Sequence, residues 1–330
     1  MAGQFSGTTF AGAIAALPLL LASFWPIPLH AAIPASERQV LINLYNASNG
    51  GSWTQNSNWC ASTCPASGAP TFAASGTECT WHGIGCDAGG SHVTAIELSG
   101  NNLLGALPDL SGLSSLQYFS VVSNKLGGSI PTLSGLAQLR VFYADNNALS
   151  GSIPSLAASI QLREFSVQSN ALSGAIPSLA GLVNLNSFLA NGNRLSGSIP
   201  SLSGLANLQD FEVGNNQLSG SIPALTGTTG LLKFVADHNL LSGSIPSLSA
   251  ASGLLQVNLA ANRFTGNVPA APLNLYTPLA WAPSSLCANP LNLAPSANDA
   301  GWNAATGFTP WWATPHASNQ CDGIMTGTFE

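Results

Sequence analysis

A 23-residue repeat constrains this chain more than any other feature of its sequence. Aligned on the motif N-x-L-x-G-x-I-P, an Asn returns once in every repeat without one insertion, and so does a Pro seven positions later. The Asn residues of this Asn ladder are Asn101, Asn124, Asn147, Asn170, Asn193, Asn216, Asn239 and Asn262. Fixed self-similarity at such a period is typical of a solenoid, in which each unit is too small to bury its own apolar face and stacks on its neighbours.

The positions around each Asn have distinct expected roles. Apolar residues stand eight, five and three positions before it, as Leu208, Phe211 and Val213 do before Asn216. The last two have strand period, which predicts one short strand per repeat. The Asn amide is expected to satisfy inward-facing backbone groups, a structural role rather than a catalytic one. The Gly before each Ile-Pro step is expected to permit a positive-φ bend.

The repeat and both of its flanks resemble a known family. The unit L-x-x-L-x-L-x-x-N-x-L-S-G-x-I-P, seen from Leu208 to Pro223, resembles the plant-type leucine-rich repeat of polygalacturonase-inhibiting proteins and receptor-kinase ectodomains. The segment C-T-W-H-G-I-G-C-D at 79–87 resembles the N-terminal cap of that family, and L-C-A-N-P-L at 286–291 resembles its C-terminal cap. The low Lys content with high Ala and Gly favours a bacterial secreted version.

This resemblance implies a fold. The expected class is an α/β repeat solenoid dominated by β-structure. The implied elements are a right-handed superhelix, a concave parallel β-sheet, a second short sheet, 3₁₀ turns on the outer side and disulfide-closed caps. The expected segments are a signal peptide over 1–35, an N-terminal cap over 36–92, eight leucine-rich repeats over 93–269 and a C-terminal cap over 270–330.

The start of the chain indicates export. The apolar stretch from Phe10 to Pro28 is followed by small residues, as in a secretory signal. No Lys or Arg precedes Arg38, so the start of the chain lacks the basic residues of a signal peptide, and an uncleaved N-terminal anchor is the alternative. We expect a protein that is secreted or exposed on the cell envelope, with no membrane span in the mature chain.

Six cysteines flank the array, at Cys60, Cys64, Cys79 and Cys86 before it and at Cys287 and Cys321 after it. Export favours disulfides, and the nearby histidines lack the spacing of a zinc site. Eight rungs at about 4.8 Å would separate the two caps by roughly 35–40 Å, beyond the reach of a disulfide. Cys287 is therefore expected to pair with Cys321, which leaves three pairings open among the other four. The family resemblance favours Cys79 with Cys86, and hence Cys60 with Cys64.

Candidate ligand-binding residues lie on three rows of the expected concave face. Residues six, four and two positions before each Asn should point away from the core. The candidates on these rows are Tyr118, Tyr143, Asp145, Glu164, Asp210, Glu212, Lys233 and Asp237. Only 6% of the residues are charged, yet six of the thirteen acids fall on these rows. An irregular set on a regular frame is typical of a binding surface, whereas the plainer alternative is that these charges keep an exposed sheet soluble.

We therefore expect a non-catalytic extracellular recognition protein that binds a protein ligand through its concave face. An enzyme inhibitor and a host-interaction factor are narrower versions of this expectation. One alternative is a glycan-binding or adhesive module that uses the tyrosines and the C-terminal Trp281, Trp302, Trp311 and Trp312. Another is a passive structural surface protein.

Other function classes are disfavoured. A net charge of −6 with only seven Lys plus Arg leaves no basic stripe for nucleic acid. The sequence has no nucleophile elbow, zinc helix signature or phosphate-binding loop in the required context. We accordingly expect no catalytic residue, no metal and no cofactor, and the sequence does not indicate an oligomeric state.

Overall fold

The computed structural model describes residues 32–275, 284–307 and 309–312. Most of the signal segment expected over 1–35 lies outside the described residues, and so do Trp281 and Cys321. The pairing expected between Cys287 and Cys321 therefore also falls outside them. The chain divides into a first unit, Met1–His30, and a second unit that contains every described element.

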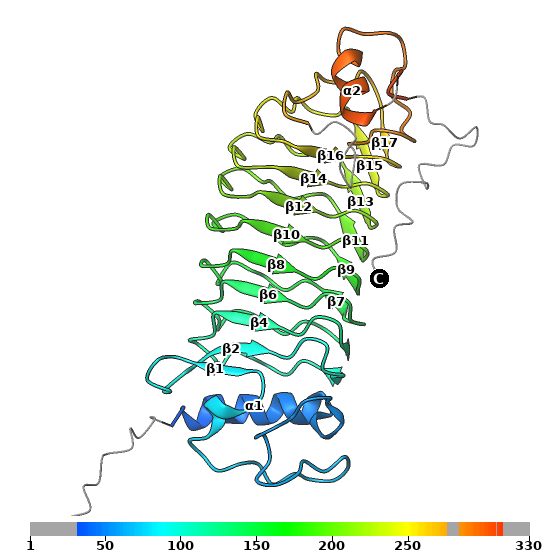
Figure 1. Ribbon diagram of the computed structural model, residues 1–330. Coiled ribbons are helices and arrows are strands. Elements are labelled where there is room, and N and C mark those ends of the chain that lie inside the picture. Colours follow the sequence, from blue (N-terminus) through cyan, green and yellow to red (C-terminus); the bar gives the residue numbers. More distant parts are fainter. Residues whose placement is uncertain (1–31, 276–283, 308, 313–330) are drawn as a thin grey trace, which may run out of the picture. The chain divides into compact units, whose positions relative to one another are not determined.

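The described residues form a β-dominated solenoid built on one nine-stranded sheet (Figure 1). The first strand is antiparallel to the second, and every later strand runs parallel to its neighbours. In spatial order the strands are β1 (Ile84–Cys86), β2 (Val93–Glu97), β4 (Tyr118–Ser120), β6 (Val141–Tyr143), β8 (Glu164–Ser166), β10 (Ser187–Leu189), β12 (Asp210–Glu212), β14 (Lys233–Val235) and β16 (Gln256–Asn258). Residues one repeat apart face each other, so that Phe119 lies opposite Phe142 and Phe142 opposite Phe165. The predicted solenoid with one strand per repeat is confirmed.

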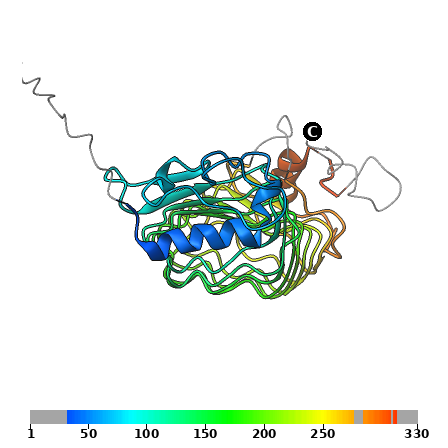
Figure 2. The same ribbon diagram turned by 90° about the horizontal axis from the view of Figure 1, so that it is seen from below.

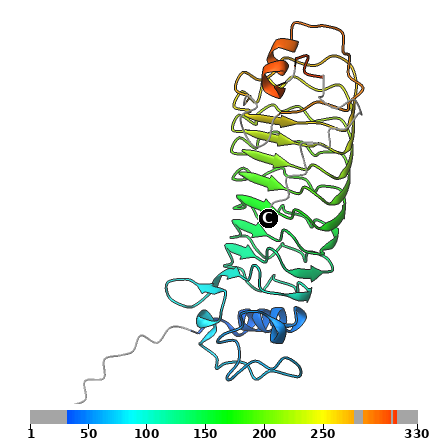
Figure 3. The same cartoon turned by 45° about the vertical axis from the view of Figure 1, so that its right-hand side comes forward.

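A second set of short parallel strands lies beside the long sheet (Figure 3). Six of these strands form one sheet: β7 (Ser150–Ser152), β9 (Ala171–Gly174), β11 (Arg194–Gly197), β13 (Gln217–Gly220), β15 (Leu240–Gly243) and β17 (Arg263–Phe264). A separate pair consists of β3 (Leu104–Ala106) and β5 (Lys125–Gly127). The repeat glycine has positive φ, for example 74° at Gly151 and 76° at Gly197, as predicted. The outer connections are turns of the 3₁₀ type, such as that closed by the Leu185 amide on the Leu182 carbonyl at 2.9 Å.

Stacked phenylalanine rings form the centre of the core. The members of this phenylalanine column are Phe119, Phe142, Phe165, Phe188, Phe211 and Phe234. Successive ring centroids lie 5.2–5.6 Å apart, and none of the rings is exposed. Because each ring packs on the rung before and the rung after, the column ties neighbouring repeats together.

From Asn124 onward, each Asn of the ladder joins two rungs by hydrogen bonds, whereas Asn101 bonds to Gln55 of the N-terminal cap. Asn193 is representative: its Oδ1 accepts from the Leu172 amide at 3.0 Å. Its Nδ2 donates to the Val167 carbonyl at 2.9 Å and the Ala190 carbonyl at 3.2 Å. The same contacts recur from Asn147 to Asn262 at corresponding positions. These are the inward-facing backbone groups that would otherwise meet no water.

The ladder continues beyond the repeat in the sequence. Asn289 lies past Ser285, the position at which the period would place the next Asn. Its Nδ2 donates to the Leu259 carbonyl at 2.9 Å and the Leu286 carbonyl at 3.0 Å. Its Oδ1 accepts from the Phe264 amide at 3.1 Å. The residues around Asn289 therefore form a ninth rung that the fixed period does not predict.

An N-terminal cap covers the first rung. Helix α1 (Ala35–Ala47) lies across the end of the stacked strands (Figure 2). Its Leu41 and Leu44 are fully buried. Tyr45 of the helix packs in a cluster with four other aromatic residues, which are Trp53, Trp59, Phe72 and Trp81. Two 3₁₀ turns, η1 (Gly50–Ser52) and η2 (Glu78–Thr80), complete the cap.

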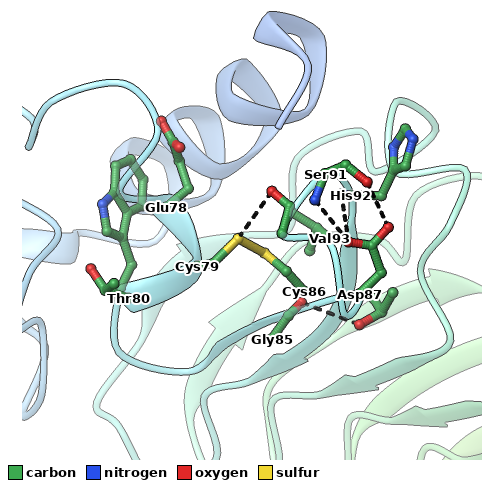
Figure 4. The surroundings of a disulfide bond; sticks show 12 residues. Glu78, Cys79, Thr80, Gly85, Cys86, Asp87, Ser91, His92 and Val93 are labelled. Carbon is green, nitrogen blue, oxygen red and sulfur yellow. Dashed lines mark hydrogen bonds between the residues drawn. A yellow bond between two sulfur atoms is a disulfide. The ribbon is translucent and has the colours of Figure 1, made fainter. Parts of the chain in front are cut away.

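Two disulfides close this cap in the pairing that the resemblance implied. Cys60 bonds to Cys64, and Cys79 bonds to Cys86 (Figure 4). The second bond joins η2 to β1, the antiparallel edge strand of the long sheet. Beside it, Asp87 accepts hydrogen bonds from the amide and hydroxyl of Ser91, which lower the pKa of its carboxyl.

A buried carboxylate joins α1 to the first repeat strand. Glu37 is 2% exposed, and its Oε2 accepts from the Val93 amide at 2.7 Å. Its Oε1 lies 2.7 Å from Nδ1 of His92, and this hydrogen bond raises the pKa of the imidazole. Arg38, next on the helix, pairs with the buried Glu78 of η2. These charged residues therefore hold α1 against η2 and against the first repeat strand.

The C-terminal cap contains helix α2 (Asp299–Thr306). Trp302 is fully buried and donates from Nε1 to the Pro269 carbonyl at 2.8 Å. Trp311 is 3% exposed and donates to Asp299 at 3.1 Å, and its ring packs edge-on against Trp312 at 5.1 Å. These indoles cover the end of the array instead of forming an open aromatic platform. No helix in the described ranges is long and apolar enough to cross a bilayer.

Candidate functional site

A pocket of about 170 Å³ opens on the concave face, which we define as the solvent side of the long sheet. It lies over β6, β8 and β10 and is lined by Tyr143, Asp145, Glu164, Phe165, Ser166, Gln168, Ser187 and Leu189. The hollow arises from side-chain size along one row. Ser166 lies between Tyr143 and Leu189 on the neighbouring rungs, so two large side chains stand on either side of a small one.

Tyrosine hydroxyls hold two carboxylates on this face. Tyr143 donates to Oε2 of Glu164, and on the preceding rung Tyr118 donates to Oε2 of Glu97 at 2.8 Å. The two tyrosine rings meet edge to face at 6.2 Å. Burial and the bond to Glu97 raise the pKa of Tyr118, so its hydroxyl remains a donor at neutral pH.

Asp145 is held in the pocket by the next rung. Its Oδ1 accepts from the Ser166 hydroxyl at 2.5 Å and from the backbone amide of Gln168 at 2.6 Å. Burial nevertheless raises the pKa of this carboxyl, and hydrogen bonds from Ser166, from the backbone of Gln168 and from its own backbone offset only part of that effect. The carboxylate is therefore fixed in position while its charge is poorly compensated.

The remaining candidates lie farther along the array. Nδ2 of Asn191 donates to Oε1 of Gln168 at 3.1 Å and to Oε2 of Glu212 at 2.8 Å. Lys233 lies 3.9 Å from Glu212. In the next row, Asp210 accepts from Ser187 at 3.2 Å. Side-chain contacts thus connect the pocket with Asp210, Glu212 and Lys233, which are not part of its lining.

Asp237, expected to line the concave face with the other candidates, is fully buried. Its Oδ2 lies 2.8 Å from Nδ1 of His238, the turn residue before Asn239, whose φ is 50°. Its Oδ1 lies over Gly214 on the preceding rung, where a Cβ would stand only 2.6 Å from that oxygen. The absence of a side chain at Gly214 provides the space in which the carboxylate is buried.

Sequence reasoning selected Tyr143, Asp145 and Glu164 but missed the neutral lining residues Gln168, Ser187 and Leu189. All three lie on the predicted outward rows, but the selection favoured charged and aromatic residues. A small residue between two large ones on the same row, at positions 143, 166 and 189, was the signal that would have indicated the hollow.

No protein-family model matches the chain. Among solved structures, the chain is similar to the ectodomain of the plant membrane receptor kinase GASSHO1/SCHENGEN3 from Arabidopsis thaliana, solved in complex with CASPARIAN STRIP INTEGRITY FACTOR 2. The match has 32% identity and a TM-score of 0.60, and it covers 68% of this chain and 30% of that one. The plant peptide hormone receptor RGFR1, in complex with RGF2, matches at 32% identity and a TM-score of 0.52, over 57% of this chain and 31% of that one.

A shorter protein matches over nearly its whole length. A plant ice-binding protein has 22% identity and a TM-score of 0.54, with 80% of this chain and 97% of that one covered. At this identity the match shows the fold alone. The chain thus has the plant-type leucine-rich-repeat fold of these receptor ectodomains, and it spans about a third of the length of the two solved receptor chains.

Proposed function

We propose that this protein is a non-catalytic extracellular recognition module that binds a polypeptide ligand on its concave face. The pocket between Tyr143 and Leu189 is the observation that carries the proposal. At about 170 Å³ it is smaller than the roughly 300–1,000 Å³ of pockets that enclose a drug-sized molecule. It therefore suits one side chain of a larger partner better than a free small molecule.

Two further observations support this proposal. The GASSHO1/SCHENGEN3 and RGFR1 ectodomains were each solved with a ligand, and they share the fold of this chain. The two disulfides of the N-terminal cap suit an oxidising compartment, in keeping with a secreted or envelope-exposed protein. Within this proposal, an enzyme inhibitor like the polygalacturonase-inhibiting proteins, in a bacterial secreted version, is the narrower hypothesis.

The test is a comparison of capture from extracellular extracts by three forms of the full chain. Leu189→Trp fills the pocket with bulk and leaves every charge in place. Ser219→Trp places the same bulk on an exposed residue of β13 in the second sheet and serves as the matched control. Circular dichroism and urea unfolding establish that all three forms are folded.

A polypeptide retained by the wild type and Ser219→Trp but lost from Leu189→Trp supports the proposal. Equal recovery of every polypeptide by all three forms contradicts it and favours a passive structural surface protein. The glycan-binding alternative has less support, because Trp302 and Trp311 are buried and the hydroxyls of Tyr118 and Tyr143 already donate to carboxylates.

A further inference from the structure

The pocket has an uncompensated negative charge. One oxygen of each acid is occupied: Oδ1 of Asp145 by Ser166 and Gln168, and Oε2 of Glu164 by Tyr143. Among the described residues, no hydrogen bond from another residue reaches the other oxygen of either carboxylate, and none of the four ion pairs includes Asp145 or Glu164.

The lining supplies no cation of its own. None of the eight residues around the pocket is Lys, Arg or His. Asp145 is half-buried, and desolvation disfavours the charged form of a carboxyl that has no cationic partner. The raised pKa of Asp145 reflects the same deficit. A positive group in the pocket would therefore stabilise the charged form of Asp145, which burial disfavours.

The uncharged residues that line the pocket limit the shape of the positive group that can bind there. The Tyr143 ring lines one side and Leu189 the other, with Phe165 also in the lining. An aromatic face attracts a flat cation, and a leucine contacts the methylene stem of a long basic side chain. A guanidinium also presents several donors in one plane, which matches two free carboxylate oxygens better than a compact ammonium does.

We infer that the pocket takes an arginine side chain of the polypeptide partner, with its guanidinium between Asp145 and Glu164 and its stem between Tyr143 and Leu189. This inference rests on the proposed function for the nature of the partner, and it deepens that proposal by naming the group that is bound. The carboxylates position and neutralise the cation, and no bond is made or broken.

The test uses a minimal probe, N-acetyl-arginine methylamide, titrated into the full chain and followed by ligand-observed NMR. The matching neutral probe is N-acetyl-citrulline methylamide, which keeps the shape and loses the charge. Asp145→Asn and Glu164→Gln remove each charge but retain the acceptor oxygen for Ser166, Gln168 or Tyr143. Glu97→Gln is the control, because Glu97 accepts from Tyr118 in the same manner outside the pocket.

We expect the arginine probe to bind the wild type and Glu97→Gln with affinities within about twofold. Each pocket variant should weaken binding about tenfold or more, as the loss of one charge-assisted hydrogen bond implies. The citrulline probe should not bind. Equal binding of the two probes, tighter binding of a lysine probe, or equal loss in Glu97→Gln would overturn the inference.

The outcome is separable from that of the proposed function. A captured polypeptide that depends on Leu189 but binds Asp145→Asn and Glu164→Gln as it binds the wild type would overturn the arginine inference and leave concave-face recognition standing. Arginine-probe binding with no polypeptide that depends on Leu189 would uphold the pocket assignment and contradict the proposed function.

Discussion

From Asn124 onward, the side-chain amides of the Asn ladder each bond to two rungs at the same time. Asn193 accepts from Leu172 of the preceding repeat, and it donates to Val167 of that repeat and to Ala190 of its own. Asn193 is 9% exposed, so water cannot replace these contacts. A column of identical amides is thus explained by backbone chemistry alone, which leaves binding to the residues that vary between rungs.

Replacing Asn193 by Ala is expected to lower the free energy of unfolding by about 1–3 kcal/mol, because buried backbone groups lose their partner. Urea unfolding measures this change. The control is Asn207→Ala, which removes one hydrogen bond to the Val183 carbonyl from an exposed position and should cost about 0.5 kcal/mol or less. Similar costs for the two variants would contradict the special role of the ladder.

Gly214 offers a second test at this scale. Gly214→Ala places a methyl group 2.6 Å from Oδ1 of Asp237 and should cost about 1–3 kcal/mol through overpacking. In an Asp237→Ala background the same substitution should cost much less, because the carboxylate that it meets is gone. A double-mutant cycle by urea unfolding measures this coupling, and additive costs would show that Gly214 is not needed to accommodate Asp237.

At the scale of elements, the junction between α1 and β2 depends on a single carboxylate. Glu37 accepts from the Val93 amide at the start of β2 and from the ring of His92. The Glu37 side chain of the helix thus provides the hydrogen-bond acceptor for the first backbone amide of β2. The helix is attached through this hydrogen bond and through its buried apolar residues, Leu41 and Leu44.

This junction should depend on pH in a defined direction. The bond to Glu37 raises the pKa of His92 above its ordinary 6.5, so the folded state favours the protonated ring. The resulting stabilisation is complete below pH 6.5 and is lost as the pH rises through the raised pKa. The difference in Tm between the wild type and His92→Gln should therefore shrink as the pH is raised across this window.

A Glu37→Gln background provides the control for this prediction. There, His92→Gln should produce little further change in Tm at any pH in the window, because the acceptor that raised the pKa has lost its charge. A difference in Tm that stays constant or grows with rising pH would contradict the assignment.

At the scale of the whole solenoid, stability is the sum of contacts between neighbouring rungs. Phe165 stacks on Phe142 and Phe188, whereas Phe119 at the end of the column stacks on Phe142 alone. Loss of a ring in the middle of the column therefore removes two stacking contacts, and loss of the ring at its end removes one.

Phe165→Ala should cost about 3–5 kcal/mol, as expected for a large buried aromatic residue. Phe119→Ala should cost less by about 0.5–1.5 kcal/mol, the contribution of one aromatic pair. Urea unfolding of both variants measures the difference. Equal costs, or a larger cost at Phe119, would show that ring stacking does not determine the coupling between rungs.

The sequence predicts the periodic part of the structure well, because every rung repeats the same local chemistry. The Asn contacts, the positive φ of the repeat glycine and the two described disulfides follow from motifs of fixed spacing or from the resemblance that those motifs carry. The role of Asn289 was not predicted because this residue lies outside the period, which would place the next Asn at Ser285. The residue before a ladder Asn also has positive φ, as at Ser169 and His238, and because it is often not a glycine the sequence does not reveal this conformation.

The candidate site was only partly predictable, for a physical reason. The outward rows follow from strand geometry, and they correctly contain every lining residue of the pocket except the core ring of Phe165. The hollow, however, depends on the relative size of three side chains on neighbouring rungs. The burial of Asp237 likewise depends on Gly214, a residue of the preceding rung whose own sequence context gives no warning.

The constancy of the Asn contacts has a consequence for how such a chain can evolve. Every junction from Asn147 to Asn262 joins its two rungs through the same hydrogen bonds at the same sequence offsets. Unequal recombination that removes or duplicates the codons of one whole repeat therefore keeps these hydrogen bonds at the new junction. The number of rungs can change in one genetic step, and when the repeat lies outside β6, β8 and β10 the pocket stays intact while its distance to one of the two caps changes.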